Sequence, residues 1–205
     1  MSFPATRKSA VYAVTSSDPG ERNRAIDLIV DGYWKPVCKY ILLKWRVSIE
    51  DAEDLTQAFF AVACEKNFFK DYDSNRARFR TFLRVCIDRF VSNERKFCSR
   101  IKRGGKAEHV TLDFDVAADR CFERECNRSI FNLAIENLQR ECERLDKRKH
   151  FALFERYDLD EAPRTYDQLA KEFGLSTTDV TNYLAWVRRH FRRIVLELRA
   201  QIDPL

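Results

Sequence analysis

Nine basic side chains fall within one stretch, Arg78 to Arg103, against only two acidic ones, Asp88 and Glu94. Nine cations less two anions give this stretch a net charge of +7, which exceeds the +5 of the whole chain. Its apolar residues recur three or four positions apart, as on one face of a long helix. We interpret the stretch as a helix that holds an extended anion, and a phosphate backbone is the commonest such anion. A basic helix face that is only solvated is the alternative.

A second stretch, 165–193, has the spacing of a helix-turn-helix. Two capping boxes, Thr165 with Gln168 and Ser176 with Asp179, frame a glycine that suits a left-handed turn. The second helix carries small polar residues near its start, placed to reach base edges, and arginines further along, placed to meet phosphates. These candidates are Thr177, Thr178, Thr181, Asn182, Arg188 and Arg189. A helical hairpin without DNA contacts is the alternative.

A third group of polar residues is acidic and follows a capping box formed by Ser48 and Asp51. The helix that this box opens carries a small acidic patch. Its candidate residues are Asp51, Glu53, Asp54 and Gln57. From periodicity alone, the helix dipole is a sufficient reason for acidic residues near a helix N-terminus.

The residues of common catalytic and metal sites are missing or scattered. The sequence has no P-loop, no G-x-G-x-x-G after a strand and no H-E-x-x-H, and none of its three histidines stands with a nucleophile. Cys121, Cys126, Cys142 and His150 could be grouped as metal ligands, but no C-x-x-C pair supports that grouping. We therefore expect no enzyme activity, no catalytic residue, no cofactor and no metal.

Composition and periodicity predict an all-α protein made of two small helical domains joined by a linker. The 205 residues include only five Gly and five Pro, hairpin dipeptides such as Asn-Gly are missing, and helical spacing is widespread. We expect a loose N-terminal arm at 1–20, a first domain at 21–104, a linker at 105–126 and a second domain at 127–203. Pro36 is expected to bend or divide the first long helix.

The sequence predicts a soluble, cytoplasmic protein. Its first residues contain no apolar core of a signal peptide, and no run of 18 apolar residues occurs. The seven cysteines are an odd number and stand mostly at apolar helix positions, as reduced core residues of an intracellular protein do.

Three stretches together resemble a known family. DAEDLTQAFF at 51–60, FRTFLRVCIDRFVSNERK at 79–96 and TYDQLAKEFGLSTTDVTNYLAWVRR at 165–189 resemble bacterial RNA polymerase sigma factors of the sigma-70 family. The resemblance is to the small two-domain extracytoplasmic-function (ECF) type and covers about residues 22 to 200. Each stretch is moderately specific, whereas their order and separation are more so.

The resemblance implies a role for each stretch. The first domain resembles sigma region 2, whose acidic helix docks on the clamp helices of the largest subunit of core RNA polymerase. The basic helix would bind and help to open the −10 promoter element, where a base leaves the stack and enters a snug pocket. The second domain resembles region 4, which reads the −35 element in the major groove. The residues implied for the −10 element are Arg78, Arg80, Arg84, Arg89, Asn93, Arg95 and Lys96.

Some positions depart from the family pattern. Phe82 stands where many members have Trp, and Arg89 stands where many have Asn, so the preferred −10 base cannot be inferred. Thr181 and Tyr183 stand where Arg is frequent. The short ends of the chain favour regulation in trans, by an anti-sigma factor or another regulator.

Two other functions are compatible with the same residues. A stand-alone helix-turn-helix regulator would bind duplex DNA tightly without polymerase, with a steep salt dependence. An adaptor would use the basic helix to meet an acidic protein partner, and would bind neither polymerase nor DNA.

Overall fold

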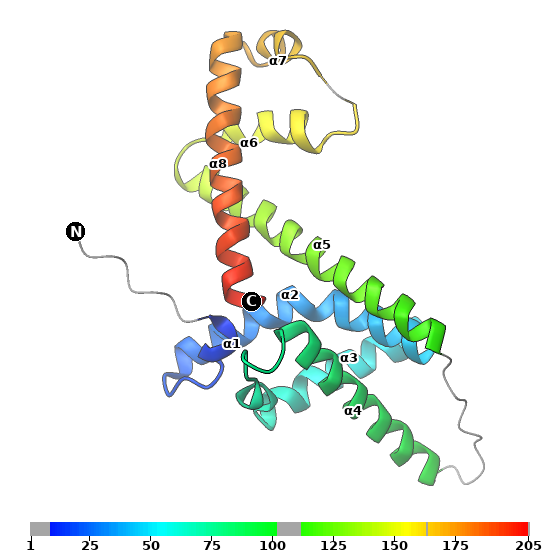
Figure 1. The fold of residues 1–205 in the computed structure, drawn as a ribbon. Helices are drawn as coiled ribbons and strands as arrows, with labels where there is room; N and C mark the ends of the chain where they lie inside the picture. The colour runs from blue at the N-terminus through cyan, green and yellow to red at the C-terminus, as the bar shows by residue number, and fades with distance from the viewer. Residues whose placement is uncertain (1–8, 102–111, 163, 205) are drawn as a thin grey trace. The chain divides into compact units, whose positions relative to one another are not determined.

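The computed structural model describes residues 9–101, 112–162 and 164–204, and every regular element in these ranges is a helix, as the sequence predicts (Figure 1). The elements are α1 (Ala10–Ala13), α2 (Pro19–Trp45), α3 (Ile49–Glu65), the 3₁₀-helix η1 (Phe68–Asp71), α4 (Phe79–Ile101), α5 (Leu112–Arg144), α6 (Arg148–Phe154), the π-helix η2 (Glu155–Leu159), α7 (Tyr166–Phe173) and α8 (Thr177–Ile202). The described residues form two compact units. The first runs to Ile130 and includes the residues from Arg199 onward, and the second is Phe131–Leu198.

Helix α2 is continuous although it contains a proline. At its start, the Asp18 side chain accepts hydrogen bonds from the backbone N–H groups of Gly20 and Glu21. Pro19 stands in the first turn, where the missing N–H would have no partner within the helix. Of the two outcomes expected at Pro36, a bend or a division, the division does not occur, because α2 runs through the proline to Trp45. Buried side chains on both sides of the proline, such as Tyr33 and Val37, pack into the core and offset the lost hydrogen bond.

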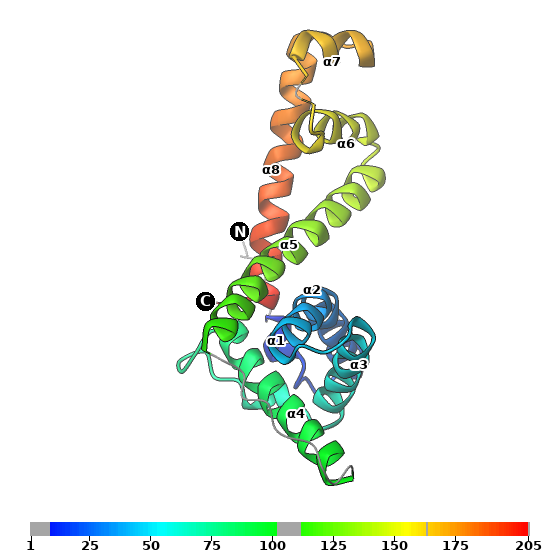
Figure 2. The ribbon, with the colours of Figure 1, turned by 90° about the vertical axis from the view of Figure 1, so that its right-hand side faces the viewer.

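An aromatic cluster forms the core of the first unit. The Phe79 ring of α4 lies 5.4 Å from the Tyr33 ring of α2 and 5.2 Å from the Tyr72 ring. Phe122 of α5 is fully buried, and its ring lies 5.4 Å from the Tyr40 ring. The first half of α5 thus lies beside α2 as part of this core (Figure 2).

The chain differs from the sequence prediction at two places in this unit. Residues 9–20, expected within a loose arm, contain α1 and the start of α2, and Val11 is buried; residues 1–8 lie outside the described residues. The linker expected at 105–126 is helical from Leu112 onward, and residues 105–111 are not described. The helical spacing of this segment is weak in the sequence because two of its buried positions, Ala118 and Cys126, carry small side chains.

The second unit contains the predicted helix-turn-helix, formed by α7 and the start of α8. The Thr165–Gln168 capping box is complete: the backbone N–H of Gln168 donates to Thr165 Oγ1, and that of Thr165 donates to Gln168 Oε1. Gly174 adopts φ 63° and ends α7 in the left-handed conformation that glycine accepts without strain. The backbone N–H of Asp179 donates to Ser176 Oγ at 3.0 Å at the start of α8. These local signals therefore form the turn that the sequence predicts.

Candidate nucleic-acid and polymerase interfaces

The acidic patch forms a surface on α3. Ser48 Oγ accepts a hydrogen bond from the Asp51 backbone N–H at 3.1 Å, which starts the helix with its acidic residues in the favourable first turns. All four predicted docking side chains are exposed. They are Asp51, Glu53, Asp54 and Gln57. Within the described ranges no ion pair neutralises these carboxylates, so the patch presents its negative charge to solvent.

One side of the basic helix α4 is committed to the fold. Only 8% of the Arg80 side chain is exposed, and its guanidinium lies 2.8 Å from Glu123 Oε2 and 2.8 Å from Asp203 Oδ2. It also donates to Asn127 Oδ1 at 3.1 Å. Burial alone would lower the pKa of Arg80, but the hydrogen bond with Glu123 and the nearby anions raise it overall, so the guanidinium stays charged. Arg80 joins α4, α5 and the end of α8 within the first unit.

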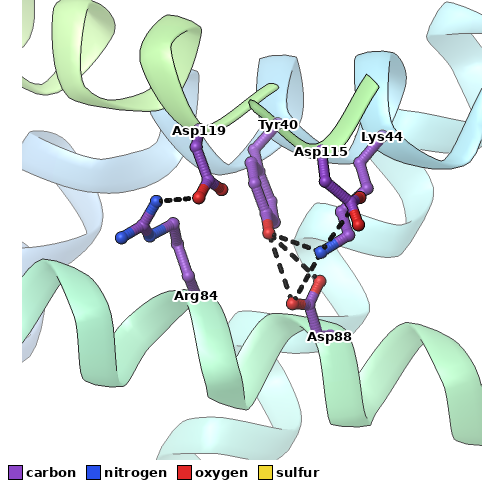
Figure 3. Close-up of polar contacts among 6 residues, drawn as sticks. All are labelled: Tyr40, Lys44, Arg84, Asp88, Asp115 and Asp119. Atoms are coloured by element: carbon purple, nitrogen blue, oxygen red, sulfur yellow. Dashed lines mark hydrogen bonds and ion pairs between the residues drawn. The ribbon is translucent and has the colours of Figure 1, made fainter. Parts of the chain in front are cut away.

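Two more cations of the first unit point at carboxylates of α5 (Figure 3). Arg84 Nη1 lies 2.6 Å from Asp119 Oδ2. Lys44 Nζ lies 2.9 Å from Asp88 Oδ2 and 3.5 Å from Asp115 Oδ1. Lys44 and Arg84 are thus both paired with carboxylates, and neither presents a free charge.

Between these pairs, the Tyr40 hydroxyl lies 3.3 Å from both Asp88 oxygens and accepts a hydrogen bond from Lys44 at 3.0 Å. Burial raises the pKa of Asp88, while the hydrogen bond with Lys44 opposes the rise. The negative charge of Asp88 is therefore paired with Lys44 inside the unit. Glu94 is the other acidic residue of this helix.

The remaining predicted DNA contacts on α4 are exposed. These are Arg78, Arg89, Asn93, Arg95 and Lys96. The Arg95 guanidinium lies 5.5 Å from the centre of the Trp45 ring, within the range of a cation–π contact. A phosphate can approach Arg89 and Arg78 here without first displacing the ion pairs that Arg80 and Arg84 make with α5.

A cavity of about 420 Å³ opens beside these exposed residues. Phe82 and Phe90 of α4 and Phe68 of η1 supply aromatic surface. The polar residues of its lining are Lys66, Asp71, Arg89, Asn93 and Glu94. Cys86 also lines it, and burial raises the pKa of this thiol to about 11, so it is uncharged at neutral pH. Aromatic side chains beside cations are the combination that binds unstacked nucleic-acid bases.

The start of α8 presents its small polar residues to solvent. Thr177, Thr178, Thr181 and Asn182 are all exposed, whereas Val180 and Leu184 between them are fully buried. The Thr181 hydroxyl donates to the Thr177 carbonyl at 2.9 Å. The buried residues pack the helix into the second unit, so the exposed ones lie on the side that a DNA groove could reach.

The two predicted arginines of α8 differ. Arg188 makes two parallel contacts with Asp158 of η2, at 2.9 Å from Nε and 2.8 Å from Nη2, and its guanidinium lies 5.0 Å from the centre of the Tyr157 ring. Arg189 is exposed and has no ion pair within the described residues. Arg188 is thus held in one conformation, while Arg189 is free to follow a ligand.

Sequence reasoning missed the carboxylates that hold these arginines. Asp115, Asp119 and Glu123 stand four residues apart in α5, which places them on one face of that helix. This spacing was a usable signal once the segment was known to be helical. Asp203 and Asp158 gave no such signal, because their contacts with Arg80 and Arg188 join residues far apart in the chain.

Comparison with known proteins adds no relative to this description. No protein-family model, no curated protein and no solved structure matches the chain. In the described part of the chain, no helix combines the length and apolar character needed to cross a membrane. Within the same residues, no three His, Cys, Asp or Glu side chains are grouped so as to hold a metal ion.

Proposed function

We propose that this protein is an RNA polymerase sigma factor of the small ECF type, which binds core polymerase, recognises a promoter and helps to open it. The observation that carries the proposal is the aromatic cavity beside Arg89 and Asn93 on the exposed side of α4. Binding to the outside of a duplex requires cations but no recess for a base. Opening a promoter requires both, because an unpaired base must be held out of the stack.

The mechanism assigns the base and the backbone of the −10 strand to different groups. The base enters the cavity that Phe82 and Phe90 line, where Arg89 and Asn93 present hydrogen-bond donors. Arg78, Arg95 and Lys96 bind the phosphates on either side. Arg80 and Arg84 do not bind the strand, because their charges are already paired with Glu123 and Asp119. They hold α4 against α5 instead.

The other two surfaces complete the proposed function. The exposed acidic patch on α3 docks on the clamp helices of the largest polymerase subunit, where its unpaired carboxylates meet basic residues. The exposed residues at the start of α8, with Arg189, contact the −35 element of promoter DNA. An anti-sigma factor or another regulator acting in trans would control access to these surfaces.

The experiment that tests this proposal is co-elution of the purified protein with core RNA polymerase in gel filtration. We expect the wild-type protein to form a stoichiometric complex, and the Glu53→Lys, Asp54→Lys double variant to form none while keeping its helical circular dichroism. The matched control is Asp27→Lys with Asp31→Lys, which reverses two exposed acidic residues of α2 away from the patch. The control should bind core polymerase as the wild type does.

The opposite result would change the assignment. Undiminished binding by the Glu53→Lys, Asp54→Lys variant would remove the docking role of α3. A well-folded wild-type protein that ignores active core polymerase but binds duplex DNA tightly would be a stand-alone helix-turn-helix regulator.

A further inference from the structure

The cavity at Phe82 and Phe90, which we call the base cavity, has a neighbour in the first unit. This second cavity also lies beside η1. Its volume is about 300 Å³. It is lined by the turn after α1, the first turn of α2 and the segment that enters η1. The lining residues are Val14, Thr15, Ser16, Arg22, Asn67 and Lys70.

This lining contains two cations and no carboxylate. Within the described residues neither Arg22 nor Lys70 takes part in an ion pair. The Arg22 guanidinium donates one hydrogen bond, from Nη1 to the Ser16 carbonyl at 3.1 Å, which fixes its direction and leaves its other N–H groups available. Asn67, which has positive φ at the start of η1, adds a side-chain amide.

The hydroxyl and carboxylate groups nearby are already committed. Thr15 Oγ1 donates to the Tyr12 carbonyl at 2.9 Å, and Ser16 Oγ is hydrogen-bonded to Glu21. Asp18 accepts the backbone N–H groups that begin α2. Glu21, which is bonded to Ser16, lines a different cavity. The available groups of this cavity are donors, and its net charge favours an anion.

The two cavities share η1 as a common wall. Lys66, Phe68 and Asp71 line the base cavity, whereas Asn67 and Lys70 line the second one. A strand whose base occupies the first cavity would therefore meet the cations of the second as it passes over η1. We propose that the cavity at Arg22, Lys70 and Asn67 binds a phosphate group of that single strand; this rests on the proposed function.

The test measures binding of a fluorescent single-stranded oligonucleotide by anisotropy at several salt concentrations. Each lost phosphate contact to a single strand should make the slope of log K against log salt shallower by about 0.7. The Arg22→Gln, Lys70→Gln double variant removes both cations that hold this one phosphate, so it should bind more weakly, with a slope shallower by about 0.7. The matched control, Arg24→Gln with Lys35→Gln, removes the same charges from exposed positions of α2 that do not line this cavity.

Equal slopes for the double variant and the control would overturn the proposal. A second arm measures the thermal stabilisation of the protein by pyrophosphate at constant ionic strength. Stabilisation of the wild type and the control, but not of the double variant, supports a phosphate site at Arg22 and Lys70. If that arm succeeds while the wild type binds no oligonucleotide, the site takes a small phosphate compound and the strand assignment is overturned. Co-elution with core polymerase tests the proposed function independently of this phosphate site.

Discussion

The two basic helices, α4 in the first unit and α8 in the second, hold their arginines to different depths. The arginines of α4 that face carboxylates are largely buried: 8% of the Arg80 side chain and 19% of the Arg84 side chain are exposed. In α8 the paired arginines stay open to solvent, with 39% of Arg188 and 46% of Arg193 exposed. Each helix also carries exposed arginines that make no such pair within the described residues, such as Arg89 and Arg189.

The comparison shows that charge count alone does not measure a nucleic-acid surface. A guanidinium has five N–H donors, and Arg80 directs those of Nη1 and Nη2 to Glu123, Asn127 and Asp203 inside the unit. Arg188 uses two of its donors on a single carboxylate, and its side chain stays partly exposed. Burial thus separates cations that stabilise the fold from cations that a phosphate can reach.

The largest effect should follow from removing the buried cation. Arg80→Met leaves Glu123 and Asp203 without their partner, and we expect the free energy of unfolding to fall by about 3 kcal/mol, the lower end for a broken buried pair, because Glu123 can regain water. Urea unfolding measures this change. The control Arg78→Met, two residues earlier and exposed, should stay within about 0.5 kcal/mol of the wild type. Equal midpoints for the two variants would contradict the division of α4 into two sides.

The two sides of α4 can also be separated by function. Arg84→Ala should lower the free energy of unfolding by up to about 1 kcal/mol, as for a partly exposed pair, and leave promoter opening nearly intact. Arg89→Ala should keep the stability and reduce opening, because Arg89 is exposed at the base cavity. Permanganate reactivity around the start site, measured with core polymerase, reports opening. Similar losses of opening in both variants would mean that the α5 side also contacts the strand.

In α8 a smaller effect is expected from freeing an arginine. Asp158→Asn releases Arg188, which should add one phosphate contact and steepen the slope of log K against log salt for duplex DNA by about 0.9. The unfolding free energy should change by less than about 1 kcal/mol, because the pair is exposed. Glu161→Gln, a nearby exposed change, is the control. A shallower slope in Asp158→Asn would instead show that Asp158 orients Arg188 for binding.

The smallest expected effect is a pH dependence of the unfolding free energy, caused by His150, which packs against α8. His150 stacks on Tyr183 at 3.9 Å, and burial, with the charge of Lys147, lowers the pKa of His150 from its usual 6.5. The unfolded chain then binds more protons between the two pKa values, so the stability of the second unit falls as pH drops through 6.5 and levels off below the folded pKa. His150→Gln should remove this part of the slope in urea unfolding against pH. An unchanged slope would show that His150 titrates alike in both states.

Local features of the protein were predictable because their causes are local. The capping box at Thr165 and Gln168 and the left-handed Gly174 depend on residues within three or four positions, so the sequence alone located this helix-turn-helix. The exposure of Glu53 and Asp54 follows in the same way from the helical spacing of α3. The all-helical fold itself belongs to this class.

The sequence by itself determined which residues are charged and which helices carry them. The tertiary structure decided which charges remain available, since Asp119, Glu123 and Asp203 reach Arg84 and Arg80 only through folding. It likewise converted part of an expected linker into core, where Phe122 packs against Tyr40. The physical reason is common to both: the burial of an apolar face and the pairing of a charge depend on partners far away in the chain, and spacing along one segment does not contain them.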